Sequence, residues 1–216
     1  MANDDRPEAL VTYLVRKIKE MVADGEYPPG SRLSPSRLAA EFGVSHIPVR
    51  EALSYLAANG YIEHRQSRGF YARELSRSEI EDIYNWRAAL ETDAYKLAVP
   101  AISEREIAEM RRITDESTAL QGHEDRVRFV ELNREFHFVA FRSAGSPTLM
   151  RLLNVLWDLA APYVVLDLIE SERSYQDHLR QIELFEKHDL DGILAAMVEH
   201  RGYRVEKVHG SSLVGE

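Results

Sequence analysis

Asn133 and His137 lie four residues apart, and two further histidines, His178 and His200, follow later in the chain. On a helix, a spacing of four places two side chains on the same face. Imidazole nitrogens and one side-chain oxygen, when several helices bring them together, suit a divalent transition metal. The expected ion is zinc, or one that behaves like nickel or manganese. Asn133 offers a neutral amide oxygen, which is a poorer ligand than a carboxylate.

The histidines also have simpler interpretations. Taken singly, each of the eight histidines is better interpreted as a surface residue or a satisfied core residue. A metal bound by three histidines could be purely structural, or it could activate water as in a hydrolase. Against an enzyme, the sequence places no general base beside these histidines. It also contains no nucleophile motif and no phosphate-binding loop.

Arg87 is a second candidate binding group, since it falls in a segment with a helical apolar pattern. A buried guanidinium can hold a ligand carboxylate through two hydrogen bonds. The alternative is a salt bridge to Glu91, one helical turn later. Tyr163 and Asp167 are expected to line the same pocket. The apolar residues expected near Arg87 are Ile83, Trp86, Leu90 and Leu97.

These side chains must be positioned by helices, because the apolar pattern from residue 78 onward is helical throughout. Six helices are expected, at 78–98, 104–121, 124–144, 146–168, 171–188 and 190–208. Ser103 followed three residues later by Glu106 is the sequence signature of a capping box. The aromatic residues expected in the core are Phe136, Phe138, Trp157 and Phe185.

The first part of the chain has a different organisation. Residues 34–72 predict a short helix, a tight turn, a second helix and a glycine-tipped hairpin. This order is typical of a winged helix-turn-helix, in which the second helix enters the DNA major groove. Ser34 with Pro35 indicates a helix start, and Gly43 suits a left-handed helix exit. Ser45 is expected to begin the second helix.

DNA contacts are expected from the start of that second helix and from the hairpin tip. N-terminal residues of such a helix contact base edges and phosphates. A glycine at the hairpin tip allows a backbone or a groove to approach closely. The residues expected to contact DNA are Arg32, Arg37, Ser45, His46, Ile47, Arg50, Arg68 and Gly69.

The charge distribution agrees with this division. The net charge is −9, yet residues 1–76 hold 10 basic and 10 acidic side chains, so the excess acid lies in residues 77–216. Such asymmetry favours one orientation of approach to DNA. The chain has no cysteine, which excludes disulfides and thiolate metal sites. With no signal peptide and no apolar run of membrane-spanning length, the expected location is the cytoplasm, with no membrane partner.

Several segments resemble a known family. YPPGSRL, LAAEFGVSHIPVREALSYLAANGYIE and SRGFYA are similar to the DNA-binding domain of GntR-type bacterial transcription regulators. IYNWRAALETDAYKLA, LNREFHFVAFRSAGSPTLMRLL and DHLRQIELFEKHDLDGILAAMVEHRGY resemble the helical FCD effector domain of the FadR subfamily. Six helices rather than seven resemble the VanR-like branch. The family usually has arginine at the position of His46, and glutamate and arginine at Pro35 and Ser36.

The resemblance implies a mainly α-helical protein with two domains, a winged helix-turn-helix at 1–76 and an effector-binding and dimerisation domain at 77–216. It also implies that Asn133 and the three histidines meet at one metal site, where the family commonly has aspartate and three histidines. The function expected is a ligand-responsive regulator, most simply a repressor, and not an enzyme. Its partners would be an inverted-repeat DNA operator, a small carboxylate effector and a second copy of the chain.

Overall fold

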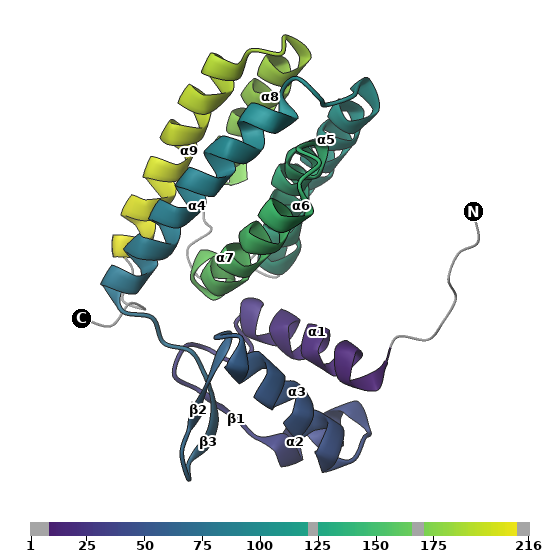
Figure 1. Ribbon diagram of the computed structural model, residues 1–216, viewed down its shortest axis with the longest axis vertical. Helices are drawn as coiled ribbons and strands as arrows, with labels where there is room; N and C mark the ends of the chain where they lie inside the picture. The colour runs from purple at the N-terminus through teal and green to yellow at the C-terminus, as the bar shows by residue number, and fades with distance from the viewer. Residues whose placement is uncertain (1–8, 121–124, 166–170, 211–216) are drawn as a thin grey trace. The chain divides into compact units, whose positions relative to one another are not determined.

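The computed structural model describes residues 9–120, 125–165 and 171–210. The chain forms two compact units, Met1–Leu75 and Ser76–Glu216. The described residues are mainly helical, with one small sheet in the first unit (Figure 1). The fold class expected from the sequence is therefore confirmed.

From residue 9 onward, where its description begins, the first unit contains three helices and three short strands. They are α1 (Leu10–Ala23), β1 (Arg32–Leu33), α2 (Pro35–Phe42), α3 (His46–Ala58), β2 (Ile62–Arg65) and β3 (Gly69–Ala72). α3 packs against both α1 and α2. Its buried face, which includes Val49, Leu53 and Leu56, closes a core with Leu14 and Ile18 of α1. The opposite side of α3 is thereby left in solvent.

Local signals in the sequence set the helix boundaries of this unit. The Ser34 hydroxyl caps α2 by accepting a hydrogen bond from the backbone N–H of Arg37, at 3.4 Å. Gly43 ends α2 in the left-handed region, with φ of 65°. Ser45 is the residue before α3, in an extended conformation. All three predictions are confirmed, and together they fix the turn between α2 and α3.

The strands form an antiparallel sheet in the order β1-β3-β2. The hairpin of β2 and β3 pairs Ile62 with Ala72 and Arg65 with Gly69. Its turn places Ser67 and Gly69 at positive φ, 61° and 100°. This hairpin is the wing expected from the sequence, and Gly69 is the first residue of β3.

The second unit contains six helices among its described residues, as the sequence predicts, with ends shifted by a few residues. They are α4 (Arg77–Ala98), α5 (Glu104–Ser117), α6 (Arg126–Ser143), α7 (Pro147–Val165), α8 (Ser171–Glu186) and α9 (Leu190–Gly210). α4 packs against α6, α7 and α9, and α8 packs against α5 and α9 (Figure 1). The four aromatic residues expected in the core are all buried in one cluster.

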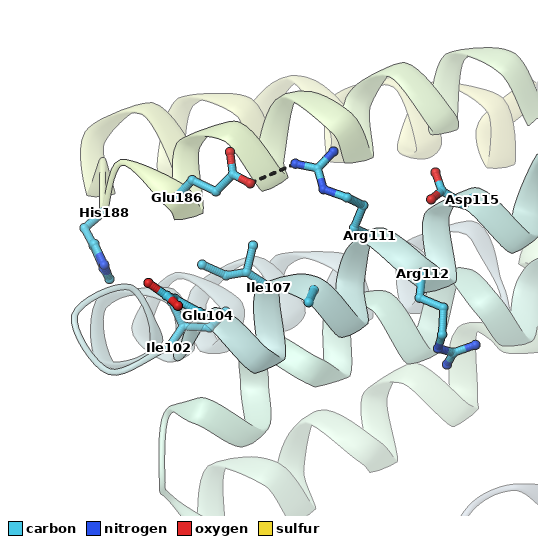
Figure 2. Close-up of a pocket in the computed structure, with 9 residues that line it drawn as sticks. Ile102, Glu104, Ile107, Arg111, Arg112, Asp115, Glu186 and His188 are labelled. Atoms are coloured by element: carbon cyan, nitrogen blue, oxygen red, sulfur yellow. Dashed lines mark hydrogen bonds and ion pairs between the residues drawn. The ribbon is translucent and has the colours of Figure 1, made fainter.

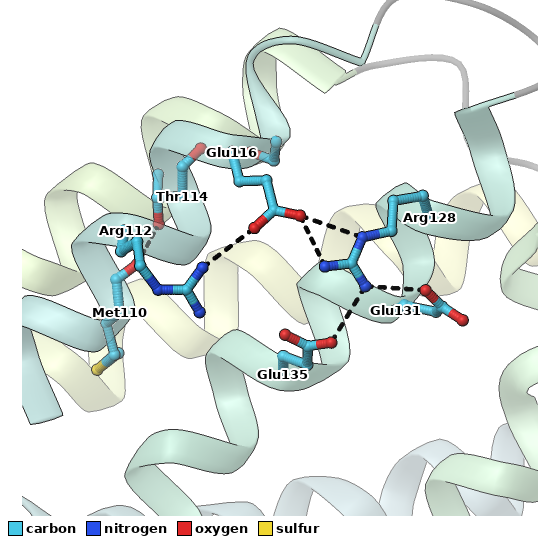
Figure 3. A network of polar contacts seen from close by, with 8 residues as sticks. Met110, Arg112, Thr114, Glu116, Arg128, Glu131 and Glu135 are labelled. Atoms are coloured by element: carbon cyan, nitrogen blue, oxygen red, sulfur yellow. Dashed lines mark hydrogen bonds and ion pairs between the residues drawn. The ribbon is translucent and has the colours of Figure 1, made fainter.

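Polar contacts fix the ends and the sides of these helices. Ser103 and Glu106 form the predicted capping box, in which the Ser103 hydroxyl accepts from the Glu106 N–H and Glu106 accepts from the Ser103 N–H. Figure 3 shows Arg128 of α6 bonded to Glu116 of α5, at 2.7 Å. Arg128 also contacts Glu131 and Glu135 of its own helix. The hydrogen bond from Arg128 lowers the pKa of Glu116, and the network ties α5 to the helix that carries His137.

Candidate metal centre and nucleic-acid interface

Three histidines from three helices meet inside the bundle. His137 lies on α6, His178 on α8 and His200 on α9, and all three are buried. One ring nitrogen from each lies within 4.8 Å of the others. The His178 ring stacks on Phe136, with centroids 3.9 Å apart, which fixes its plane. Three imidazoles at this spacing in a buried position fit the ligand set of a transition metal.

In His137 and His200, the Nδ1 atom of the imidazole ring lies beside a polar partner. The Tyr95 hydroxyl lies 3.0 Å from Nδ1 of His137, and a carboxylate oxygen of Asp177 lies 2.9 Å from Nδ1 of His200. Histidines that bind metals usually have their second nitrogen held in this way by a carboxylate or another polar group. A metal in the cluster would therefore be bound through Nε2 of His137 and of His200.

Asn133 is buried one helical turn before His137, on the same side of α6. Its amide oxygen is the oxygen ligand that the sequence offers. Whether it binds a metal stays a prediction.

Arg87 forms the salt bridge that was the alternative to ligand binding. Its Nε and Nη2 both donate to Oε1 of Glu91, at 3.1 Å each. Trp157 of α7 donates from Nε1 to the same oxygen, at 2.9 Å, and its ring lies 3.9 Å from the guanidinium carbon. Both members of the pair are buried. The role of Arg87 toward an effector stays a prediction.

The surroundings of Arg87 differ from those expected. Trp86 and Leu97 are 60% and 48% exposed, so they do not share the buried face of α4. That face instead carries Tyr84, Glu91 and Tyr95 beside Arg87. The other two residues of the expected apolar set, Ile83 and Leu90, are partly buried, and Leu90 packs against the core. Of the other two residues expected to bind effector, Tyr163 is buried and Asp167 lies outside the described residues.

A separate hollow lies on the surface of the bundle, along α5 and the turn between α8 and α9 (Figure 2). Arg111 of α5 and Glu186 of α8 bridge it through an ion pair at 2.8 Å. The residues that line it are Ile102, Glu104, Ile107, Ala108, Arg111, Arg112, Asp115, Glu186 and His188. None of the residues expected to bind a metal or an effector is among them.

In the first unit, the residues expected at the start of the DNA-reading helix are exposed. Ser45, His46 and Arg50 lie in solvent, and Ile47 is 70% exposed. The Ser45 side chain makes no capping hydrogen bond, so its hydroxyl is not committed to the helix. Arg37 is also exposed, in the first turn of α2.

The wing brings two more of the expected residues together. A Cβ atom built on Gly69 would lie 3.9 Å from Nε and Nη2 of Arg32, so the guanidinium of Arg32 lies beside the glycine backbone. Arg68 is exposed in the turn. Arg65 instead forms an ion pair with Glu63, at 2.9 Å. Its guanidinium carbon lies 4.3 Å from the centre of the Tyr71 ring. The exposed arginines of the wing and of the neighbouring strand β1 are accordingly Arg68 and Arg32.

Three residues that contact the site were not predicted from the sequence, namely Tyr95, Asp177 and Trp157. A general signal exists for Asp177, because a histidine ligand needs a second partner. The sequence has many acidic residues, however, and does not indicate which one reaches His200. For Tyr95 and Trp157, the sequence indicates only that they are aromatic residues in a helix with a buried face.

The chain matches two family models. Residues 10–72 match the bacterial regulatory proteins of the gntR family, and residues 82–202 match the FCD domain. This chain is a GntR-family transcription regulator. Relatives of this GntR protein include the Nta operon transcriptional regulator of Aminobacter aminovorans, 28% identical over 83% of the chain and 85% of that protein. The gluconate operon transcriptional repressor of Bacillus subtilis is 25% identical over 89% of the chain and 78% of that protein.

A solved structure supports the fold of the GntR regulator. E. coli McbR/YncC superposes with a TM-score of 0.86 at 21% identity, covering 94% of this chain and 99% of that one. The two matched families are regulators and not enzymes, as the sequence predicts. None of the described helices of the regulator combines the length and the apolar character that a membrane span requires.

Proposed function

We propose that this GntR-family protein is a metabolite-responsive repressor in the bacterial cytoplasm. The observation that carries the proposal is that the candidate DNA-contacting residues and the candidate metal-binding residues lie in different units. One unit exposes Arg50 and its neighbours at the start of α3, while the other buries three histidines in an acidic bundle. An effector that prefers one arrangement of the two units would shift the protein between DNA-binding and non-binding states.

The DNA partner is a double-stranded operator with two inverted half-sites. Arg50, which is exposed at the start of α3, would donate two hydrogen bonds to a guanine, which is the commonest specific contact. Arg32, Arg37 and Arg68 are suited to phosphates, which position a protein without reading sequence. Ser45, His46 and Gly69 complete the contact surface.

The effector is a small carboxylate bound in the bundle. His137, His178 and His200, with Asn133, would hold a divalent transition metal, which supplies open coordination positions for a carboxylate oxygen. The effector pocket would also use Arg87, Tyr163 and Asp167. The Glu91 carboxylate already accepts hydrogen bonds from the Arg87 guanidinium. An effector carboxylate would therefore have to share the guanidinium with Glu91 or displace Glu91. Such an exchange at Arg87 would change the contact between α4 and Trp157 of α7, which couples binding to helix position.

Exposed apolar side chains on α4 and α7 support a homodimer. Trp86 of α4 is 60% exposed, and Leu152 and Val155 of α7 are 49% and 39% exposed. The two helices pack against each other. A large exposed apolar area on a soluble protein marks an interaction site. A two-fold axis at this face would match the symmetry of an inverted-repeat operator.

The proposal is tested by selecting DNA from a random double-stranded pool with the full-length protein. Enrichment of an inverted repeat is expected, and Arg50→Ala should weaken binding to it by about 1–3 kcal/mol. Arg142→Ala, which removes an exposed arginine of the bundle, is the matched control and should leave affinity unchanged. Failure to enrich any sequence would contradict the proposal.

The sensory part of the proposal has its own test. Metal analysis of the purified protein is followed by titration of the protein–DNA complex with a panel of small carboxylates. Release of DNA by one of them is expected. Bound metal with no response to any carboxylate would favour a purely structural metal site instead.

A further inference from the structure

Ile47 is the most exposed large hydrophobic side chain among the described residues, at 70%. It is the second residue of α3, between His46 and Pro48. Single exposed apolar residues are ordinary on a protein surface. Ile47 stands out because of its place, at the N-terminal end of the helix that reads DNA.

Ile47 faces away from the core of the first unit. The buried side of α3 is formed by Val49, Ala52, Leu53 and Leu56. Ile47 precedes Val49 by two residues, a rotation of about 200° on a helix with 3.6 residues per turn. Arg50 and Ser54 follow Ile47 at spacings of three and seven, so the three side chains form one outward row. All three are exposed.

The chemistry of Ile47 limits what it can contact on DNA. An aliphatic side chain forms no hydrogen bond and no ion pair, so it contributes nothing to phosphate binding. In the major groove, the apolar group that base edges present is the C5-methyl of thymine. A β-branched side chain on a helix is also held in one main rotamer, so it loses little conformational freedom on contact.

We propose that Ile47 is a specificity-determining residue that selects a thymine in each operator half-site through its C5-methyl group. This inference rests on the proposed function, and it adds the base that one residue reads. Ile47 and Arg50 are separated by about 4.5 Å along the helix, and base pairs are about 3.4 Å apart. The thymine read by Ile47 therefore lies one or two base pairs from the guanine read by Arg50.

The experiment compares thymine with uracil, which pairs identically and lacks only the methyl group. An operator is first selected from random DNA by the full-length protein. Each thymine is then replaced in turn by deoxyuridine, in both half-sites, and affinity is measured by fluorescence anisotropy. One position should lose about fourfold per methyl, or roughly fifteenfold for two half-sites, since a buried methyl-sized group contributes about 0.8 kcal/mol.

The variant Ile47→Ala tests whether the side chain of Ile47 is the group that contacts the thymine methyl. It should bind the thymine operator more weakly and show no further loss with deoxyuridine at the sensitive position. Val198→Ala, which shortens another exposed aliphatic side chain (64%), should keep the full deoxyuridine effect. Circular dichroism of Ile47→Ala should match the wild type, because the side chain is outside the core.

The outcomes separate this inference from the proposed function. If no DNA sequence is enriched, the function itself fails. If an operator is found but no thymine is sensitive to loss of its methyl, the assignment of Ile47 is wrong. The assignment is equally wrong if Ile47→Ala retains the deoxyuridine effect, because the methyl would then be read by another group or through DNA shape.

Discussion

The hydroxyl of Tyr95 on α4 lies 3.0 Å from Nδ1 of His137 on α6, inside the bundle. The contact fixes the orientation of a proposed metal ligand from a helix that carries no ligand itself. Loss of such a partner typically lowers metal affinity roughly 10- to 100-fold. We therefore expect Tyr95→Phe to lower zinc affinity by that factor, measured by competition with a chelator.

Tyr84→Phe is the control for Tyr95→Phe. Tyr84 is also buried on α4, and its hydroxyl has no hydrogen-bond partner in the described part of the chain. Its removal should leave zinc affinity unchanged. Equal losses in both variants would indicate a general loosening of α4, and no loss in Tyr95→Phe would contradict a role for the hydroxyl.

Asn133→Asp should raise metal affinity. The carboxylate would add a negative charge and a stronger oxygen ligand one turn from His137, in a buried position where charge is little screened. Isothermal titration with zinc measures the change. Asn85→Asp adds the same charge at an exposed site on α4 and should have no effect. Unchanged affinity in Asn133→Asp would mean that Asn133 does not face the metal.

The Arg87–Glu91 pair should be sensitive to loss of one partner. Glu91→Ala would leave the guanidinium buried without its carboxylate, which costs about 3–5 kcal/mol of unfolding free energy. The double variant Arg87→Met, Glu91→Leu should recover part of this, because it removes both charges. Glu81→Ala, in the exposed Arg77–Glu81 pair of the same helix, should cost less than about 0.5 kcal/mol.

Urea unfolding measures these differences. If Glu91→Ala is no less stable than Glu81→Ala, the buried ion pair is not formed in solution. Arg87 would then be available to an effector without any exchange of partners.

How much could be predicted from the sequence depends on the distance between the interacting residues. Ser34, Gly43 and Ser103 act within one turn of chain, and each was predicted because their backbone roles are local. The contacts of Tyr95 with His137, 42 residues away, and of Trp157 with Glu91, 66 residues away, were not. They depend on how the helices are rotated in the bundle, which a hydrophobic pattern gives only coarsely.

Trp86 illustrates that limit. It neighbours Arg87 in sequence and belongs to an apolar stripe, so periodicity placed both on one face. In the structure Trp86 is exposed, whereas Leu90 of the same stripe packs against the core and Arg87 is buried beside Trp157. An exposed apolar stripe and one that meets the core have the same sequence pattern.

Capping of α5 should make stability depend on pH. The hydrogen bond from the Ser103 hydroxyl lowers the pKa of Glu106 below its ordinary value of 4.5. The ionised form is thus favoured in the folded state, so its contribution is present above pH 4.5 and is lost as the pH falls through the lower folded pKa.

Ser103→Ala should accordingly cost about 1 kcal/mol near neutral pH. The difference from wild type should shrink as the pH falls below 4.5. Urea unfolding at several pH values measures it, and Glu106→Gln, which cannot titrate, is the control. A difference that is constant with pH would show that the cap acts without the charge of Glu106.

Trp86→Ala should weaken self-association of the free protein. An aromatic residue that anchors an interface contributes about 2 kcal/mol or more, and a symmetric dimer contains it twice. The dissociation constant should therefore rise roughly a thousandfold, which about 4 kcal/mol corresponds to. Sedimentation velocity across a concentration series measures this dissociation constant.

Tyr55→Ala is the control for Trp86→Ala. It removes an aromatic side chain of similar exposure (56%) from α3 and should leave association unchanged. The exposed face of α4 and α7 would be excluded as the dimer interface if the wild-type protein sediments as a monomer at micromolar concentration. It would also be excluded if Trp86→Ala dimerises with the wild-type dissociation constant. Such a result would require operator symmetry to come from elsewhere on the chain.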